Sequence, residues 1–147
     1  MKNDFAIITK SAAETQSFGE AFARKLKQGD VVSLYGDLGS GKTQLVKGMC
    51  RSLGVTRTVN SPTFIIVNEY SSSAFPSIYH FDLYRMKTEQ EVLDMGFSDY
   101  VNEKSIVLIE WPEHVENILP SDTYKIRIAH SDEDEHTRWI RLETPEN

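Results

Sequence analysis

The chain has 147 residues, of which 39% are hydrophobic and 26% charged, and its formal net charge at pH 7 is −6. This length and balance are those of one ordinary globular domain, so residues 1–147 are predicted to fold as a single domain around one core. The negative charge disfavours broad contact with a nucleic acid backbone, so any such contact has to be local or delegated to a partner.

The N-terminal residues contain only a short apolar stretch, 5–8, which is too short for a membrane span or a signal-peptide core. Next comes a helix over 12–27, because Ser11 and Glu14 have capping-box spacing and apolar residues recur at helical spacing before Gly29. The one cysteine, Cys50, cannot form an internal disulfide and is expected as a buried small hydrophobe. A cytoplasmic location is expected.

Residues 31–35 form a short apolar run that predicts a strand buried in a mainly parallel sheet. It leads into residues 36–43, Gly-Asp-Leu-Gly-Ser-Gly-Lys-Thr, which fit the phosphate-loop pattern G-x-x-x-x-G-K-[ST] at every fixed position. A helix-like run then continues to Gly54. A strand, a glycine-rich loop and a helix in this order predict nucleoside triphosphate binding.

The chemistry follows from the residue types in the loop. Backbone N–H groups and the positive end of the helix dipole form an anion cradle, Lys42 can reach the β and γ phosphates, and the Thr43 hydroxyl can ligate Mg²⁺. The guanine-reading pattern Asn-Lys-x-Asp is absent, which favours ATP and ADP as ligands. The expected nucleotide-contacting residues of the loop are Asp37, Leu38, Gly39, Ser40, Gly41, Lys42, Thr43 and Gln44.

The remaining elements follow from capping, alternation and turn signals. They are two strands over 63–70 and 77–82 that form a hairpin, a short helix opened by Thr88 and Glu91, a helical turn within 97–103, a strand over 105–110, a turn at 119–122, and two strands over 124–129 and 137–142 around the acidic loop 132–135. This order predicts an α/β fold like that of P-loop NTPases. It has three layers, α/β/α, with a mixed, largely parallel central sheet and an antiparallel hairpin.

Glu110 ends the most apolar strand after the phosphate loop, which is the Walker B position. At the carboxyl end of a buried strand it would lie beside Thr43, where it can hold Mg²⁺ directly or through water. Glutamate is one methylene longer than the usual aspartate, so it could also orient a water as a base. Metal ligation is the favoured role.

Asp82 follows the edge of another apolar strand, in Tyr79-His80-Phe81-Asp82-Leu83-Tyr84-Arg85. It could align the attacking water or help to place the metal, or it could cap the strand end and pair with Arg85. Arg85 could alternatively stabilise the charge of the transferred group. His80 is expected to be a packed or surface residue of the strand, because no second His or Cys stands at a metal-binding spacing from it.

Two further positions keep two interpretations each. Ser61-Pro62-Thr63 precedes the hairpin and is either a nucleotide-sensing switch, with Thr63 a further nucleotide-contacting residue, or a plain turn into a strand. Trp111, between Glu110 and Pro112, is either a core or rim aromatic or part of a partner surface.

Four segments in this order resemble the bacterial TsaE (YjeE) family: 36–48, 61–64, 80–85 and 108–113. The resemblance runs from about residue 11 to about residue 120. It implies a small cytoplasmic P-loop ATPase that is needed to form N6-threonylcarbamoyladenosine, the modified base beside the anticodon of tRNAs that read codons beginning with A.

The resemblance also implies partners. The TsaD–TsaB pair would transfer the group from threonylcarbamoyl-adenylate, and the ATPase cycle would support multiple turnovers. Contact with tRNA would be indirect, through the complex, and no membrane would be involved.

The matching positions imply roles for individual residues. Thr43 and Glu110 would ligate magnesium, Lys42 would contact the phosphates, and Asp82 would be an acid important for hydrolysis. Ser61 and Thr63 resemble the family's switch-like segment, and Trp111 matches its invariant tryptophan.

Other functions remain as alternatives. The same loop could serve a small-molecule kinase with Asp82 as its base, although no segment suggests the arginine-bearing lid of such enzymes. It could also serve a nucleotide-gated binding module whose hydrolysis is incidental. Low intrinsic ATPase activity is expected, because no residue stands out as a complete arginine finger and a partner would have to complete the site.

Overall fold

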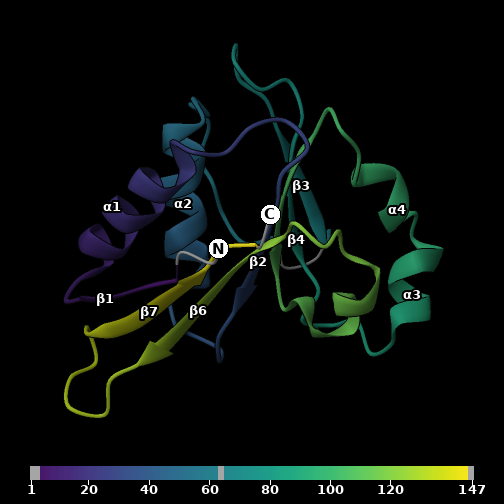
Figure 1. Cartoon of the computed structure of the whole chain (residues 1–147). Coiled ribbons are helices and arrows are strands. Elements are labelled where there is room, and N and C mark those ends of the chain that lie inside the picture. Colours follow the sequence, from purple (N-terminus) through teal and green to yellow (C-terminus); the bar gives the residue numbers. More distant parts are fainter. Residues whose placement is uncertain (1–3, 63–64, 146–147) are drawn as a thin grey trace.

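The computed structural model describes residues 4–62 and 65–145, which form a seven-stranded sheet between two layers of helices (Figure 1). The strands lie in the order β1-β7-β6-β2-β5-β4-β3. Their bounds are Phe5–Thr9 (β1), Val31–Tyr35 (β2), Val67–Tyr70 (β3), Ile78–Asp82 (β4), Ile106–Glu110 (β5), Tyr124–His130 (β6) and Arg138–Glu143 (β7). The central strands β6, β2, β5 and β4 are parallel, whereas β3 at one edge and β7 and β1 at the other are antiparallel.

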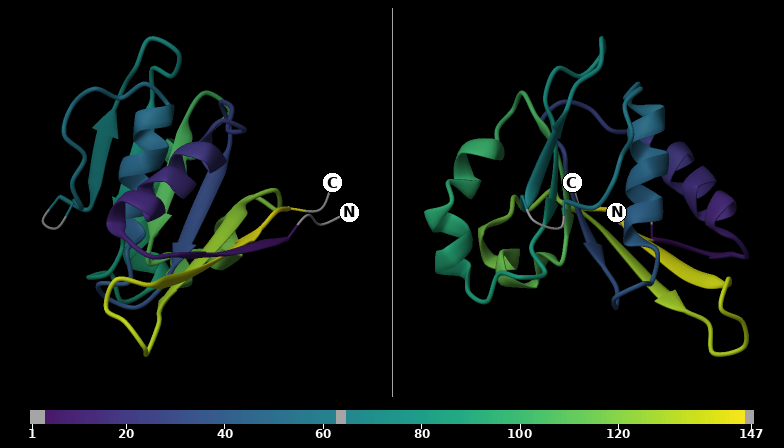
Figure 2. Two further views of the ribbon diagram at one scale, coloured as in Figure 1. Left: turned by 90° about the vertical axis from the view of Figure 1, so that its left-hand side faces the viewer. Right: turned by 180° about the vertical axis from the view of Figure 1, so that it is seen from behind.

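Helices cover both faces of the sheet (Figures 1 and 2). On one side lie α1 (Ala12–Ala23) and α2 (Lys42–Ser52). On the other lie α3 (Glu89–Asp94), α4 (Phe97–Tyr100) and the short 3₁₀ turns η1 (Pro112–His114) and η2 (Glu116–Ile118). The predicted three-layer α/β/α fold is therefore confirmed, with a parallel centre and antiparallel edges.

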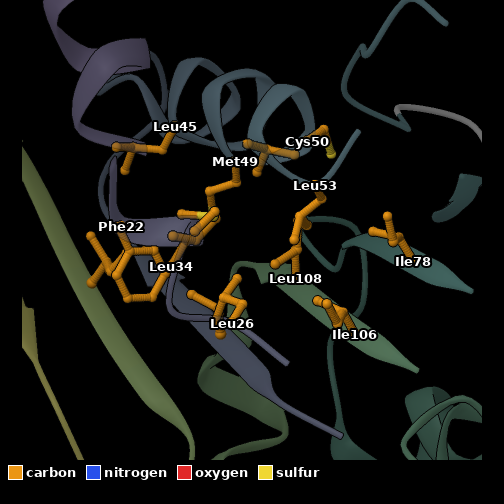
Figure 3. Close-up of a cluster of buried hydrophobic side chains, with 14 of the residues drawn as sticks. Phe22, Leu26, Leu34, Leu45, Met49, Cys50, Leu53, Ile78, Ile106 and Leu108 are labelled. Carbon is orange, nitrogen blue, oxygen red and sulfur yellow. The ribbon is translucent and has the colours of Figure 1, made fainter. Parts of the chain in front are cut away.

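The larger core lies between α2 and the sheet (Figure 3). Leu45 and Met49 of α2 are fully buried against Leu34 of β2 and Leu108 of β5. Cys50 is buried in the same cluster, as expected for a small hydrophobe. This packing fixes α2, the helix that follows the phosphate loop, against the sheet. The start of α2 is thereby held at the carboxyl ends of the parallel strands.

Helices α1 and α2 approach each other at the level of the backbone. A Cβ on Gly48 of α2 would lie 1.9 Å from the carbonyl oxygen of Gln16, and one on Gly19 of α1 would lie 2.4 Å from that of Leu45. Only glycine leaves room for such an approach. The two helices therefore form a tightly packed layer that holds the phosphate loop in place.

Three differences from the prediction have an identifiable physical cause. Strand β1 was not predicted, because its exposed apolar residues have no signal without the partner strand β7, which is distant in sequence. Helix α1 ends at Ala23 instead of residue 27, since i→i−3 hydrogen bonds form there and Asp30 captures the Lys27 amide. Strand β3 begins at Val67, because Ile66 has a φ of 72° and interrupts the extended chain.

Within residues 4–62 and 65–145, no helix has the length and apolar character needed to cross a membrane.

Candidate active site

The loop between β2 and α2 turns sharply, and its glycines are needed for the turn. Gly39 and Gly41 have φ values of 77° and 110°, which side-chain-bearing residues rarely adopt. A Cβ on Gly36 would lie 2.5 Å from both the Ile128 carbonyl oxygen and the Ser40 hydroxyl. The glycines predicted to shape the phosphate loop thus have steric reasons to be glycine.

Lys42, the first residue of α2, is folded back onto the loop. It is 4% exposed, and its Nζ donates hydrogen bonds to the carbonyl oxygens of Gly36 and, at 3.2 Å, Asp37. The ammonium also lies 3.8 Å from the centroid of the Trp111 ring, a cation–π contact. Burial lowers the pKa of Lys42, and nearby carboxylates, Glu110 foremost, oppose this shift.

The side chains of Thr43, at the start of α2, and Glu110, at the end of β5, are in contact. The Thr43 hydroxyl donates to the Glu110 carboxylate, lying 3.2 Å from both of its oxygens. Glu110 is the last residue of β5 and is only 3% exposed. Nε2 of His80, a fully buried residue of the adjacent strand β4, lies 2.6 Å from Glu110 Oε2. The buried carboxylate therefore has a hydroxyl partner on one side and an imidazole partner on the other.

Asp82 ends β4 directly beside Glu110, because these two residues are partners in the parallel β4–β5 register. Its Oδ2 accepts a hydrogen bond of 2.7 Å from the Ser61 hydroxyl, and its Oδ1 accepts one of 3.0 Å from the Tyr84 N–H. Asp82 thus caps the strand end, as the first half of one interpretation held, and its pairing with Arg85 stays a prediction. The other interpretation, that Asp82 aligns an attacking water or helps to place the metal, needs a position beside Glu110 at the carboxyl edge of the sheet, and Asp82 has that position.

Trp111 follows Glu110 in a left-handed conformation, with φ 60° and ψ 58°. This conformation is uncommon for a bulky residue and directs the chain sharply away from β5. Its ring lies 4.9 Å from that of Tyr84, centroid to centroid, and contacts the Lys42 ammonium. Trp111 is half-buried, so it is a rim aromatic that lies directly against the site.

The residues present fit a magnesium-bound nucleotide. A hydroxyl and a carboxylate are the hard oxygen ligands that Mg²⁺ prefers. The described residues contain no group of three or more His, Cys, Asp or Glu that could hold a metal, so phosphate oxygens and water would complete its coordination. The buried Ser40 hydroxyl, inside the loop, has no hydrogen-bond partner among the described residues and suits an anion acceptor.

Comparison with known proteins gives the family of the chain. A family model described as "Threonylcarbamoyl adenosine biosynthesis protein TsaE" matches residues 9–140. The chain belongs to the TsaE family. It is 42% identical over 127 residues to the tRNA threonylcarbamoyladenosine biosynthesis protein TsaE of Bacillus subtilis, covering 86% of this chain and 78% of that protein.

Other members of the TsaE family show the same likeness. The protein of that name from Haemophilus influenzae is 42% identical over 121 residues, covering 79% of this chain and 76% of its own length. The crystal structure of YdiB from Bacillus subtilis superposes with a TM-score of 0.82 at 33% identity, covering all of this chain and 89% of that one.

In this TsaE-family chain, Lys42, Thr43, Asp82 and Glu110 lie together at the carboxyl edge of the parallel strands. The loop residues differ in their surroundings. Leu38 is 71% exposed, and the Gln44 side chain accepts a 2.7 Å hydrogen bond from Gln16 of α1. The side-chain oxygen of Gln44 is thus engaged by α1. Thr63, also predicted to contact the nucleotide, lies outside the described residues.

Two contacts of this TsaE-family site were not predicted. His80 is packed, as one interpretation of it held, but its hydrogen bond to Glu110 was missed. The contact between Lys42 and Trp111 was also missed. One sequence signal existed: His80 stands two residues before Asp82 on a strand, so both project from the same face of it.

Proposed function

We propose that this chain is a magnesium-dependent ATPase of low intrinsic activity that acts in the biosynthesis of threonylcarbamoyladenosine in tRNA. One observation carries the proposal. Lys42 and Thr43, at the start of α2, converge with Glu110 at the end of β5, beside a loop that only glycines can shape. The biosynthetic role is supported by membership of the TsaE family and by the names of the relatives.

The loop residues would bind the triphosphate through their backbone N–H groups, with the start of α2 adding its dipole. Lys42 would exchange its contacts with the Gly36 and Asp37 carbonyls and the Trp111 ring for the β and γ phosphates. Thr43 and Glu110 would hold Mg²⁺. When bound, the ion neutralises the charge that develops on the phosphates.

Asp82 would orient the attacking water from the neighbouring strand end. Its hydrogen bond from Ser61 ties it to the segment that leads into Thr63, which would let that segment respond to the nucleotide. In the sequence, no arginine stands out as a complete arginine finger. A partner would therefore complete the site and raise turnover.

The proposed partners are the TsaD and TsaB proteins, with ATP and ADP as the nucleotides and the cytoplasm as the location. Contact with tRNA would be made through the complex, in keeping with the net charge of −6.

Two other functions use the same site. A small-molecule kinase would need an acceptor pocket and an enclosing lid, and the helices α3 and α4 are too short to supply a long one. A nucleotide-gated binding module would need Lys42 and Thr43 but not Asp82. The Asp82 carboxylate therefore separates an ATPase from a binding module.

The test is to compare the wild type with Lys42→Ala and Asp82→Asn. We would measure ATP affinity, ATPase rate with and without TsaD–TsaB, and the modified-base content of tRNA from a depleted strain that carries each variant. Lys42→Ala should lose nucleotide binding, and Asp82→Asn should bind ATP but fail in hydrolysis and modification. Full modification by Asp82→Asn would favour the binding module, and an ATP-dependent phosphorylated metabolite would favour the kinase.

A further inference from the structure

We propose that His80 is a positioning residue, which holds the Glu110 carboxylate in the orientation that Mg²⁺ binding requires. This inference deepens the proposed function and rests on it. His80 would contact neither the nucleotide nor the metal, and would act only through Glu110.

The first support is the geometry of the pair. His80 is fully buried and Glu110 is 3% exposed, and the 2.6 Å distance between Nε2 and Oε2 is that of a strong, charge-assisted hydrogen bond. The parallel register pairs His80 with Leu108 and Asp82 with Glu110, so His80 lies one strand over and two residues back from the carboxylate. Neighbouring strands of a sheet thus set both ends of the bond.

The second support is what the bond does to the side chain. The terminal torsion of a glutamate is broad, so a carboxylate at a strand end can present either edge to a ligand. Donation from His80 to Oε2 restricts this rotation, while the Thr43 hydroxyl lies 3.2 Å from both oxygens. The carboxylate is therefore held facing Thr43, the other proposed metal ligand.

The third support is the position of the proton. Ligation of Mg²⁺ requires Glu110 as a carboxylate, whose oxygens only accept hydrogen bonds, so in that state Nε2 of His80 carries the hydrogen. Nδ1 is buried and has no hydrogen-bond partner among the described residues. The His80 ring packs beside the Tyr70 ring, with the centroids 6.3 Å apart and the planes inclined by 29°. The imidazole is thus held by packing against Tyr70 of β3, and its Nε2–H group donates to Glu110.

The cost of this arrangement points to function. Burying a carboxylate and an imidazole costs desolvation energy, and apolar side chains of similar volume commonly fill such places with equal or better stability. The neighbours Ile78, Ile106 and Leu108 show that this part of the sheet is otherwise apolar. Carboxylates that ligate metals are in turn hydrogen-bonded, and loss of that support typically weakens metal binding or activity by 10–100-fold.

The experiment uses the full chain and three substitutions of His80. His80→Gln places an amide N–H as far from the backbone as Nε2 and should keep the bond. His80→Asn keeps polarity but is too short to reach Glu110, and His80→Leu removes the donor while keeping volume. His136→Leu, at an exposed histidine of the β6–β7 loop, is the surface control, and Ile106→Val is the control for a small core change.

The readout is nucleotide binding and does not depend on turnover. The affinity for a fluorescent ATP analogue is measured in EDTA and then across a Mg²⁺ titration, with the melting temperature of each variant recorded alongside. His80→Leu and His80→Asn should need about 10–100-fold more Mg²⁺ for half-maximal effect, with unchanged affinity in EDTA. His80→Gln and both controls should stay close to the wild type.

Two results would overturn the proposal. One is a wild-type Mg²⁺ dependence in folded His80→Leu or His80→Asn, and the other is a His80→Gln variant as impaired as His80→Asn at equal melting temperature. If His80→Leu fails to fold, the comparison of glutamine with asparagine decides alone. Failure of the proposed function gives a different outcome, because the wild-type chain itself would then bind no nucleotide.

Discussion

Gly48→Ala tests the backbone contact between α1 and α2, because two opposing effects have to be weighed. Alanine is favoured over glycine in a helix interior by about 1 kcal/mol. Against this, the new Cβ would lie 1.9 Å from the Gln16 carbonyl oxygen, whereas ordinary contact begins at 3.4 Å. The difference of 1.5 Å has to come from separating the two helices, because the obstructing atoms are backbone.

Overpacking of this kind costs about 1–3 kcal/mol, and a backbone obstacle places the cost at the upper end. After subtraction of the helix-propensity gain, we expect Gly48→Ala to lower the free energy of unfolding by about 2 kcal/mol. In a domain of this size that corresponds to a melting temperature lower by about 5 °C or more. The shift of α2 should also weaken ATP binding, since Lys42 and Thr43 begin this helix.

The assay is urea unfolding followed by circular dichroism, with Ser52→Ala on the same helix as the control. The denaturation midpoint of Gly48→Ala should fall with an unchanged m-value. The free energy of unfolding of Ser52→Ala should stay within about 0.5 kcal/mol of the wild type. A Gly48→Ala variant as stable as the wild type, or more stable, would refute this reasoning. The gain in helix propensity would then outweigh the clash of the new Cβ with the Gln16 carbonyl oxygen.

Other consequences can be measured separately. In a Trp139→Phe background, the emission of Trp111 should change when ATP binds, because Lys42 leaves its ring; constant emission at saturating ATP would contradict the exchange of contacts. Asp82→Asn should bind ATP within a few-fold of the wild type but hydrolyse it at least about 10-fold more slowly, and equal rates would exclude its role on the water. Burial raises the pKa of Cys50 to about 12 from 9.0, so the native thiol should resist labelling at pH 8, and prompt labelling of the folded chain would be inconsistent with that burial. Since the folded pKa is the higher one, this group's contribution to stability is complete below pH 9 and is lost as the pH rises from 9 towards 12.

Local signals predicted most of the fold. The capping residues Ser11 and Thr88 accept hydrogen bonds from the amides three residues on, and the strand over 31–35 was located without error. Strand β1 was missed, because Phe5 and Ile8 are exposed and the strand exists only through pairing with β7 at the far end of the chain. No local pattern reports such a pairing.

The candidate site shows the same division. The loop and the approach of Glu110 to Thr43 could be predicted, because the carboxyl ends of parallel strands meet at one edge. The bond from His80 to Glu110 could not, since it depends on β4 and β5 being neighbours in a defined register. The contact of Lys42 with Trp111 depends on the left-handed turn after β5, which tryptophan seldom adopts.

We propose that the triphosphate and its magnesium are bound by the loop after β2, by Lys42 and by the Thr43–Glu110 pair. Titration calorimetry of the folded wild-type chain with ATP tests it most directly, first in EDTA and then with Mg²⁺. We expect saturable one-to-one binding that Mg²⁺ strengthens in the wild type and no longer strengthens in Glu110→Gln. The absence of any heat of binding for the wild-type chain, or the same gain from Mg²⁺ in Glu110→Gln, would contradict it.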